Sequence, residues 1–400
     1  MGVNISYMGT KRDLASAVAD VVGLAKPGIL LDAFSGMCSV GERVAPSRQI
    51  WSNDVQLFAA EVGRALFTCK DEPYSAIRAA DLLFDRFENH RLKLLDVCRA
   101  SVKAEDSLLS SENFVVFSKR WARLSKALAS DVARLRTKRA TLFSRIYSNN
   151  YLGVRQAIEA DAIRRAIFVN HRVGQNSNDH KRWLMIALGR ALLKVANSTG
   201  HFAQYLKPKQ TTYKRYSNQR RRSLWSEWLF SIGELQAVGS EDWRRKNRGF
   251  NEDSLLLIPK LASQKDRPTV VYADPPYTED QYSRYYHLFE TLMLYDYPKV
   301  TGVGLYRPSR FQTPFSIKSK VCAALDSLVS ATAEIGADMI LSYPSNGLVI
   351  QAGADPGDIL RAHFRNVKCC RSLAYSHSTF GASKGAAHAA VTERIYLARL

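Results

Sequence analysis

A short apolar run that ends in two consecutive prolines constrains this 400-residue chain more than any other feature. Residues 269–273 have strand-like composition, and Asp274-Pro275-Pro276-Tyr277 follow directly. Proline fixes φ near about −65° and has no N–H donor, so the Asp274 carboxylate and the Pro275 carbonyl can be held rigidly as acceptors. Such acceptors suit a planar amino group like that of adenine, and Tyr277 offers a face for base stacking. The alternative is a strand that ends in a Pro-Pro turn beside a capping aspartate.

A second apolar run, near the N-terminus, enters a turn of small residues. It begins at Leu30 and continues through Asp32 to Gly41. Glycine lets the backbone approach a ligand closely, and ligands of doubly wound sheets bind at the carboxyl ends of strands. Gly36 and Gly41 do not have the G-x-G-x-x-G spacing of a dinucleotide fingerprint. We therefore expect a smaller nucleoside ligand at this turn.

The next strand-like run, residues 49–52, ends at Asn53 and Asp54. An acidic residue at the tip of the second strand is well placed to accept hydrogen bonds from ribose hydroxyls. Asp54 could instead cap the helix that we expect over residues 55–67. The turn that precedes this strand favours the ribose role.

In order and spacing, these segments resemble the Dam-like, alpha-group DNA adenine methyltransferases, which use S-adenosylmethionine. An aromatic-x-Gly-x-Lys segment at residues 7–11 comes first, a Phe-x-Gly loop at 34–36 follows, and the Asp-Pro-Pro-Tyr box comes after a long insert. The resemblance covers roughly the first seventy and the last hundred and fifty residues. It implies an α/β fold: a Rossmann-like methyltransferase sheet, mostly parallel with an antiparallel hairpin at its end. It also implies methyl transfer from S-adenosylmethionine to the exocyclic amine of a flipped adenine in a specific duplex DNA sequence.

The same resemblance implies roles for individual residues. Lys11 would face the cofactor's carboxylate and Asp54 its ribose. Asp253 resembles the family's acidic residue near the cofactor's adenine ring, although it is equally suited to cap a helix over residues 254–261. Many relatives have a second glycine where this chain has Cys38, and a side chain there is expected to narrow the loop. The implied cofactor-binding residues are Tyr7, Met8, Gly9, Lys11, Asp32, Phe34, Ser35, Gly36, Asp54 and Asp253, and the implied catalytic residues are Asp274, Pro275, Pro276 and Tyr277.

The middle of the chain has a different pattern from the two ends. From about residue 75 to 206 it shows long helical periodicity, including residues 132–146 and 183–195, with almost no strand signal. We predict a catalytic domain formed by residues 1–72 and 245–400, and a helical, basic insert at 73–244 that recognises the DNA target. Cations recur in the insert with few acids between them, which favours phosphate contact over a solvated helix face. They are Lys119, Arg120, Arg123, Lys126, Arg134, Arg136, Lys138, Arg139 and Arg145.

A second basic segment, residues 207–222, interleaves cations, amides and tyrosines and is the best candidate for reading DNA. It could be disordered until bound, or it could be a flexible linker without sequence specificity. Residues 281–290 are rich in aromatic side chains that could stack on an extruded base, and they also fit an amphipathic helix over 285–295. The candidate DNA-binding residues are Lys209, Lys214, Arg215, Arg220, Arg221, Arg222, Tyr282 and Arg284.

The C-terminal part returns to alternating helix and strand patterns. We expect a helix over residues 316–335 and a strand over 338–343. Two late strands are expected over 367–375 and 394–400, and these would form the hairpin that the resemblance implies.

The composition agrees with a polyanionic partner, since the formal net charge is +20 and the pI is near 9.7. Six cysteines without C-x-x-C spacing and eight unclustered histidines predict reduced thiols and no metal site. No run of about eighteen apolar residues and no signal pattern is evident, so we expect a cytoplasmic protein of a prokaryote or phage with no membrane partner. A restriction endonuclease could be its cognate partner, although the chain carries no nuclease motif.

Three alternatives stay open at this point. The same box occurs in RNA amino-methyltransferases, although the long insert and the motif order favour duplex DNA. Methylation of the cytosine amine is disfavoured because that activity more often carries Ser at the first position of the box. The chain could also be a DNA-binding relative that lost cofactor affinity through Cys38.

Overall fold

The computed structural model describes residues 3, 13–137, 139–377 and 389–400. The chain divides into two compact units, and we treat each by itself. The sheet unit comprises Met1–Lys70, Ala237–Ser283 and Phe311–Leu400, and the helical unit comprises Asp71–Gln236 and Arg284–Arg310. The helical unit therefore includes a segment, Arg284–Arg310, that the sequence analysis placed in the catalytic domain.

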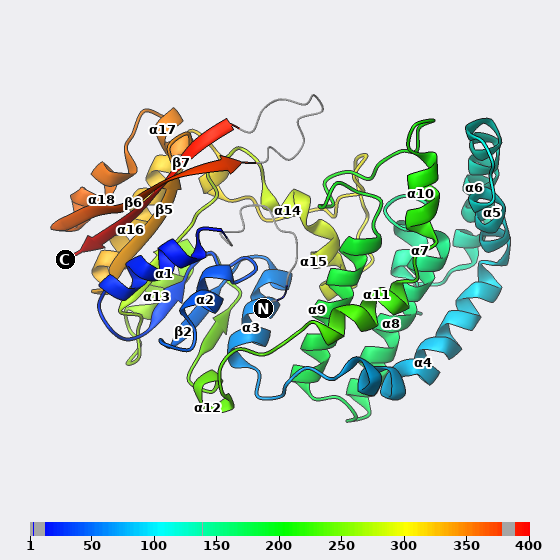
Figure 1. Cartoon of the computed structure of the whole chain (residues 1–400), viewed down its shortest axis with the longest axis horizontal. Coiled ribbons are helices and arrows are strands. Elements are labelled where there is room, and N and C mark those ends of the chain that lie inside the picture. Colours follow the sequence, from blue (N-terminus) through cyan, green and yellow to red (C-terminus); the bar gives the residue numbers. More distant parts are fainter. Residues whose placement is uncertain (1–2, 4–12, 138, 378–388) are drawn as a thin grey trace. The chain divides into compact units, whose positions relative to one another are not determined.

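The sheet unit is built on one seven-stranded sheet with the order β3-β2-β1-β4-β5-β7-β6 (Figure 1). The five strands from β3 to β5 run parallel, and β7 pairs antiparallel with both β5 and β6. The predicted α/β fold, with a mostly parallel sheet and an antiparallel hairpin at its end, is confirmed. The strands are β1 (Leu30–Asp32), β2 (Ile50–Asn53), β3 (Arg248–Phe250), β4 (Val270–Ala273), β5 (Asp338–Pro344), β6 (Asn366–His377) and β7 (Ala389–Arg399).

Helices cover both faces of this sheet. Leu31, Val271 and Met339 are paired across β1, β4 and β5, and they pack in one apolar core with residues of α13 and α16. Their chain neighbours Leu30 and Val270 are equally buried and face the opposite side. Burial on both faces explains why the strands read as continuous apolar runs. The helices of this unit are α1 (Ala15–Leu24), α2 (Ser39–Val44), α3 (Leu57–Thr68), α12 (Glu241–Arg244), α13 (Ser254–Leu261), η1 (Pro314–Ser316), α16 (Val321–Glu334), α17 (Leu348–Gln351) and α18 (Pro356–His363).

The strand order reverses between β1 and β4. From β1 the chain passes through α2 to β2 on one side, and after β3 it crosses to β4 on the other side of β1. The loops that leave two such strands diverge, and the crevice between them is where open α/β sheets bind ligands. The register pairs Asp32 with Tyr272, so the loop after Asp32 and the box at Asp274 begin side by side.

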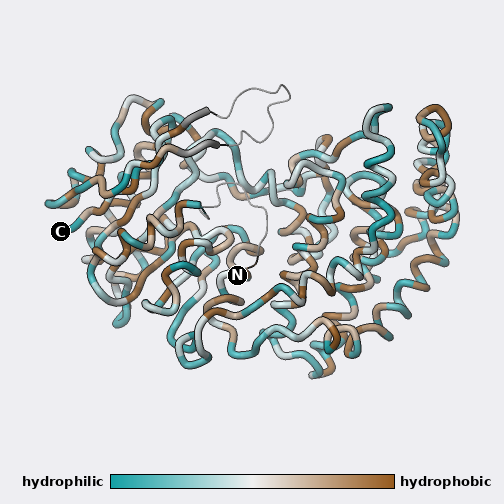
Figure 2. Tube along the Cα trace, in the orientation of Figure 1, coloured by the Kyte–Doolittle hydropathy of each residue, from teal (hydrophilic) through white to brown (hydrophobic). Residues whose placement is uncertain are grey.

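The helical unit contains only helices and their connections among its described residues. Its helices alternate hydrophilic and hydrophobic residues along their length, as amphipathic packing requires (Figure 2). One aromatic core joins α5, α6 and α10 through Leu108, Phe117 and Tyr216. The helices are α4 (Ala76–Val97), α5 (Arg99–Leu109), α6 (Phe114–Arg134), α7 (Leu142–Ile146), α8 (Val154–Arg172), α9 (Asn178–Val195), α10 (Tyr213–Arg220), α11 (Leu224–Gly233) and α15 (His287–Leu294), with α14 (Tyr282–Tyr285) at the division between the units.

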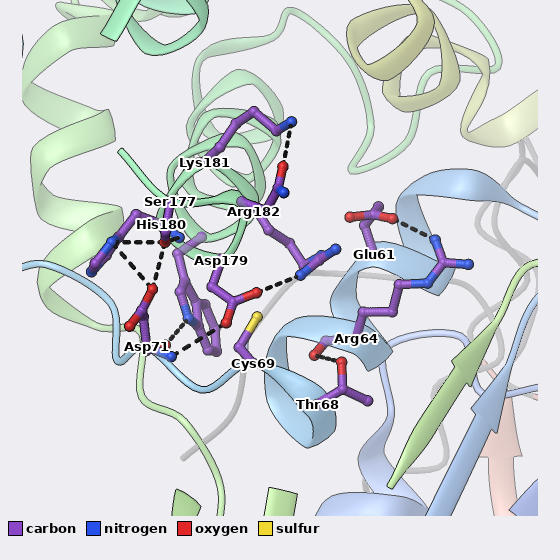
Figure 3. Close-up of polar contacts among 12 residues, drawn as sticks. Glu61, Arg64, Thr68, Cys69, Asp71, Ser177, Asp179, His180, Lys181 and Arg182 are labelled. Atoms are coloured by element: carbon purple, nitrogen blue, oxygen red, sulfur yellow. Dashed lines mark hydrogen bonds and ion pairs between the residues drawn. The ribbon is translucent and has the colours of Figure 1, made fainter. Parts of the chain in front are cut away.

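At the N-terminus of α9, Ser177 and His180 contact Asp71, which lies between α3 and α4 (Figure 3). Ser177 Oγ donates to Asp71 Oδ2 at 2.5 Å and lies 3.0 Å from His180 Nδ1, and the same Nδ1 lies 3.6 Å from Asp71. Ser177 also accepts from the backbone N–H of His180. In a Ser-His-Asp catalytic triad, one ring nitrogen of the histidine contacts the serine and the other contacts the aspartate. Because one nitrogen faces both groups here, the cluster is a helix cap.

One helix prediction in this unit is wrong. Residues 132–146 do not form a continuous helix: α6 ends at Arg134, and α7 begins at Leu142. The intervening Leu135 is extended and buried, and Ala140 has a φ of 53°. No glycine or proline marks this break in the sequence. Leu135 packs in the core with Tyr213 and Tyr216 of α10, and Arg145 of α7 donates to the Leu135 carbonyl. Among the described residues of the chain, no helix is long and apolar enough to cross a membrane.

Candidate active site

The tips of β1, β2 and β4 surround one cavity of the sheet unit, with about 990 Å³ of empty space including the part open to solvent. We call it the sheet-unit cavity. It brings together most of the described residues predicted to bind the cofactor or to act in catalysis. Pro275 is buried beside it, whereas Tyr7, Met8, Gly9 and Lys11 lie outside the described residues. The predicted residues that line the cavity are Asp32, Phe34, Ser35, Gly36, Asp54, Asp253, Asp274, Pro276, Tyr277 and Tyr282.

The loop after β1 is held by the tip of β2. The N–H of Ser35 donates to the Asn53 carbonyl at 2.9 Å, and the N–H of Gly36 donates to Asp54 Oδ2 at 2.9 Å. Gly36 has a φ of 48°, which favours glycine at this position. Asp54 Oδ1 accepts from the N–H of Gln56 before α3. Asp54 therefore fixes the loop and also faces the cavity, and burial raises its pKa to about 6.

Four carboxylates, of Asp32, Asp54, Asp253 and Asp274, make this cavity strongly acceptor-rich. Asp32 is 2% exposed, and among the described residues its Oδ1 atom has no hydrogen-bond partner. Burial raises the pKa of Asp32 to about 8, and the nearby charges of Asp274 and then Asp54 add to the rise. Such a group of acceptors suits a ligand with hydroxyl donors or positive charge.

The Asp-Pro-Pro-Tyr box is anchored on both sides. The N–H of Ala33 donates to the Tyr272 carbonyl at 2.9 Å, which joins the box's strand to the loop after β1. The N–H of Leu348 donates to the Tyr277 carbonyl at 3.0 Å. Tyr277 is 8% exposed and belongs to the same apolar core as Phe315. Its ring therefore has one part in the core and one part in the cavity wall.

A wall of the cavity that sequence reasoning missed is formed by Phe311 and Thr313. Gln281 Nε2 donates to the Thr313 carbonyl at 3.3 Å, and the N–H of Thr313 donates to Gln281 Oε1 at 3.0 Å. Ser283 Oγ donates to the Phe311 carbonyl at 2.7 Å. No sequence motif marks these contacts between segments thirty residues apart, although the glutamine and serine lie directly after the box. Met37, Ser39, Val40, Val55 and Gln56 also line the cavity without having been predicted.

The position of Asp253 suits both roles that the sequence left open, the helix cap and the contact with a cofactor. Its side chain accepts from the N–H of Leu255 at 3.0 Å and so caps α13. It also lines the cavity. Ser254 Oγ donates to the Ala33 carbonyl at 2.6 Å, which ties the start of α13 to the loop after β1. The cap is confirmed, and the contact with a cofactor stays a prediction.

Cys38 is not part of the cavity lining, and the expected narrowing of the loop stays a prediction. The residue has a φ of 63° and is fully buried, but it is absent from the cavity lining, although Met37 and Ser39 on either side of it are present. Its Sγ atom lies 3.5 Å from the place where a Cβ on Gly63 of α3 would stand. The thiol therefore packs against α3.

The basic segment of the helical unit contains one prediction that is wrong. Arg220 is 3% exposed, with its guanidinium 3.5 Å from Glu105, 3.1 Å from Asn149 and over the ring of Tyr216. A cation in this position stabilises the interior and does not reach DNA. The segment is also not wholly disordered, because Tyr213–Arg220 forms α10.

The other predicted DNA-binding residues are accessible. Lys209, Lys214 and Arg215 are exposed. Arg222 is exposed and ion-paired with Glu227 at 2.6 Å. Arg221 is exposed and donates to the Leu109 carbonyl. Arg284 is exposed, and its Nε donates to Tyr306 Oη at 3.1 Å. Tyr282 lies in the lining of the sheet-unit cavity.

A family model described as D12 class N6 adenine-specific DNA methyltransferase matches residues 147–336, which include the Asp-Pro-Pro-Tyr box. The predicted resemblance to adenine-N6 DNA methyltransferases is confirmed. The narrower assignment to the alpha group of these methyltransferases stays a prediction. The match does not extend to residues 30–54, so their connection with the box comes from the pairing of β1 with β4.

Three curated proteins are also similar to the chain. Modification methylase StsI of Streptococcus sanguinis is 26% identical over 201 residues, which cover 50% of this chain and 27% of that protein. Modification methylase LlaI of Lactococcus lactis subsp. lactis is 22% identical over 316 residues, or 78% and 42% of the two chains. Type II methyltransferase M.FokI of Planomicrobium okeanokoites is 22% identical over 362 residues, or 89% and 47%. The chain thus spans less than half the length of these relatives, and no solved structure gives a significant match.

Proposed function

We propose that this chain transfers a methyl group from S-adenosylmethionine to the exocyclic amine of adenine in double-stranded DNA. The observation that carries the proposal is the position of the Asp-Pro-Pro-Tyr box, beside the Asp32 loop, on a cavity at the reversal of strand order. The family match and the names of the three relatives support the same reaction.

The cavity residues fit S-adenosylmethionine by their chemistry. The cofactor has ribose hydroxyls, an ammonium group and a sulfonium, and the described residues offer Asp32, Asp54 and Asp253 as acceptors. The unpartnered Oδ1 atom of the buried Asp32 is a vacant acceptor inside this lining. Phe34, which packs edge-on against Phe315 at 5.4 Å, adds an apolar surface for the adenosyl portion.

When bound, S-adenosylmethionine would supply the methyl group of its sulfonium and leave as the neutral thioether, and the methylated amine would then release one proton to solvent. The Asp274 carboxylate and the Pro275 carbonyl accept the two hydrogens of the adenine amine. This pair of hydrogen bonds favours a tetrahedral nitrogen and frees its lone pair for attack. Asp274 orients the amine and need not act as a strong base. Tyr277 and Tyr282 hold the plane of the extruded base, so catalysis rests on positioning and electrostatics.

The description of the matching family names DNA, which favours DNA over RNA as the substrate. Cys38 lies outside the cavity lining, which supports an enzyme over a relative that lost cofactor affinity. A cognate restriction endonuclease stays a prediction without support from the chain itself.

The experiment compares methyl acceptors. The purified chain is incubated with radiolabelled S-adenosylmethionine and with duplex DNA, single-stranded DNA or RNA of the same sequence content. We expect label in the duplex DNA, on adenine N6 after digestion to nucleosides. Label in RNA alone would show that RNA, and not DNA, is the substrate. If calorimetry detects no binding of millimolar S-adenosylmethionine, the proposal that the chain is a methyltransferase is contradicted.

A further inference from the structure

The helical unit contains a second cavity, with about 1510 Å³ of empty space including the part open to solvent. We call it the helical-unit cavity. It lies between α4, α8 and the described residues 135–137 and 139–141 between α6 and α7. Its lining includes a single carboxylate, Asp85. The same lining includes six cations: Arg86, Lys93, Arg134, Arg136, Arg139 and Arg165.

Most of these cations have no charge partner. Arg134 pairs with Asp131. For Lys93, Arg136, Arg139 and Arg165, no carboxylate lies within ion-pair distance in the part of the chain that the structure describes. Like charges that face one hollow repel each other, so their arrangement costs free energy unless an anion binds among them.

The pKa of the buried His90 is sensitive to two of these cations. His90 is 8% exposed, and burial lowers its pKa, with a further lowering by the charges of Arg165 and Lys93. The Ala140 carbonyl can only accept, so the 2.9 Å contact requires the proton on His90 Nε2. The ring is therefore a neutral anchor for the cavity wall.

The wall that carries Arg136 and Arg139 is fixed at several points. Besides the bond from His90, Thr141 Oγ1 donates to the Arg136 carbonyl at 2.9 Å, and the N–H of Thr141 donates to Tyr297 Oη at 3.0 Å. Leu135 at the start of the segment is 3% exposed. The backbone at Ala140 and Thr141 is thus anchored, which lowers the entropy that a ligand must overcome on binding.

We propose that the helical-unit cavity binds the phosphate groups of the DNA backbone without reading the bases. The proposal rests on the proposed function, which supplies DNA as the substrate. Apart from the His90 ring, the lining has no aromatic side chain on which a base could stack, and Asn89 is its one side-chain amide. Arginine and lysine neutralise phosphates independently of sequence. The cavity therefore positions the duplex and leaves recognition to other residues.

The test removes two cavity cations and compares them with two matched cations. The variant Arg136→Gln/Arg165→Gln loses two unpaired charges of the cavity. The control Arg99→Gln/Arg155→Gln loses two charges of the same unit that are ion-paired with Asp96 and Asp106. Binding of each full-length variant to a fluorescent DNA duplex is measured by anisotropy over a range of salt concentrations.

We expect the cavity variant to bind duplex DNA about tenfold or more weakly at low salt, with the slope of log K against log salt reduced by about 2. The control is expected to stay within about twofold of wild type. Arg136→Lys/Arg165→Lys keeps the charges and should keep the salt slope. Unchanged melting temperature and unchanged binding of S-adenosylmethionine by the sheet unit show that the cavity variant is folded.

Equal binding of wild type and cavity variant would overturn the proposal, as would equal losses in variant and control. Calorimetry with ADP distinguishes a free nucleotide from the backbone: loss of ADP binding in the cavity variant with unchanged DNA binding would also overturn it. A wild-type chain that binds DNA in the expected way but transfers no methyl group would contradict the proposed function alone.

Discussion

At the scale of single residues, buried carboxylates set the chemistry of the sheet-unit cavity. Asp274 and Asp54 lie within electrostatic reach of Asp32, and the burial of Asp32 removes the water that would screen their charges. The acceptors that prepare the cavity for a cationic donor also destabilise its empty state at neutral pH.

Asp32 gives a prediction for the pH dependence of stability. Its folded-state pKa of about 8 lies above the unfolded value of 3.8, so its contribution is fully present below about pH 4 and is lost as pH rises toward 8. We expect Asp32→Asn to flatten this decline in the free energy of unfolding, by at most about 1.4 kcal/mol per pH unit. Urea unfolding from pH 5 to 8 measures it, with the exposed Asp81→Asn as control. Parallel curves for wild type and Asp32→Asn would contradict the assignment.

Cys38 gives a second prediction because its φ of 63° disfavours any Cβ. Cys38→Gly and Cys38→Ala both remove the thiol, and only glycine also removes the Cβ. We expect the glycine variant to have the larger free energy of unfolding, by about 1 kcal/mol. Chemical denaturation of the pair measures the difference. Both variants should bind S-adenosylmethionine like wild type, and an alanine variant as stable as the glycine variant would refute the strain.

Arg220 separates an interior role from DNA contact. Its removal leaves Glu105, which is equally buried, without its cation. We expect Arg220→Met to lower the free energy of unfolding by about 3 kcal/mol. Arg215→Met, in the same helix but exposed, should change it by less than about 0.5 kcal/mol. Thermal and urea unfolding compare the two, and equal stabilities would show that the buried pair contributes nothing.

At the scale of elements, glycine decides how closely α3 approaches β2. A Cβ on Gly63 would overlap Ser52 Oγ and stand 2.9 Å from Ser52 Cβ, which the strand holds in place. We expect Gly63→Ala to destabilise the protein by about 1–3 kcal/mol despite its better helix propensity. Gly23→Ala in α1 meets nothing within 4 Å and should be neutral or stabilising. Denaturant unfolding of both variants checks this, and similar effects would mean that α3 can shift away.

The strands and the loop-bearing tips could be predicted from sequence because each is encoded locally. Val270–Ala273 is continuously apolar and ends at two prolines, and the turn after Asp32 is rich in small residues. The break between α6 and α7, the burial of Arg220 and the wall at Phe311 could not be predicted, because each depends on partners far away in sequence. Periodicity within a window cannot report such partners.

At the scale of the whole molecule, the motif-bearing parts and the basic insert fold as units with separate tasks in the proposed reaction. The sheet unit holds the acceptor-rich cavity, and the helical unit carries cations without carboxylate partners among its described residues. This division predicts that binding of S-adenosylmethionine and binding of DNA can be impaired independently. Measuring the binding of S-adenosylmethionine and of DNA by Asp32→Asn and by Arg136→Gln/Arg165→Gln tests that independence.

The central claim is that Asp274 orients an adenine amine for methylation, and the most direct measurement is single-turnover methyl transfer by Asp274→Ala. Wild type, this variant and the exposed control Asp266→Ala are mixed with labelled S-adenosylmethionine and duplex DNA, and N6-methyladenine is quantified by mass spectrometry. We predict that Asp274→Ala binds S-adenosylmethionine and duplex DNA within about threefold of wild type, yet forms N6-methyladenine at least about a thousandfold more slowly. N6-methyladenine formed by Asp274→Ala at the wild-type rate would contradict the account.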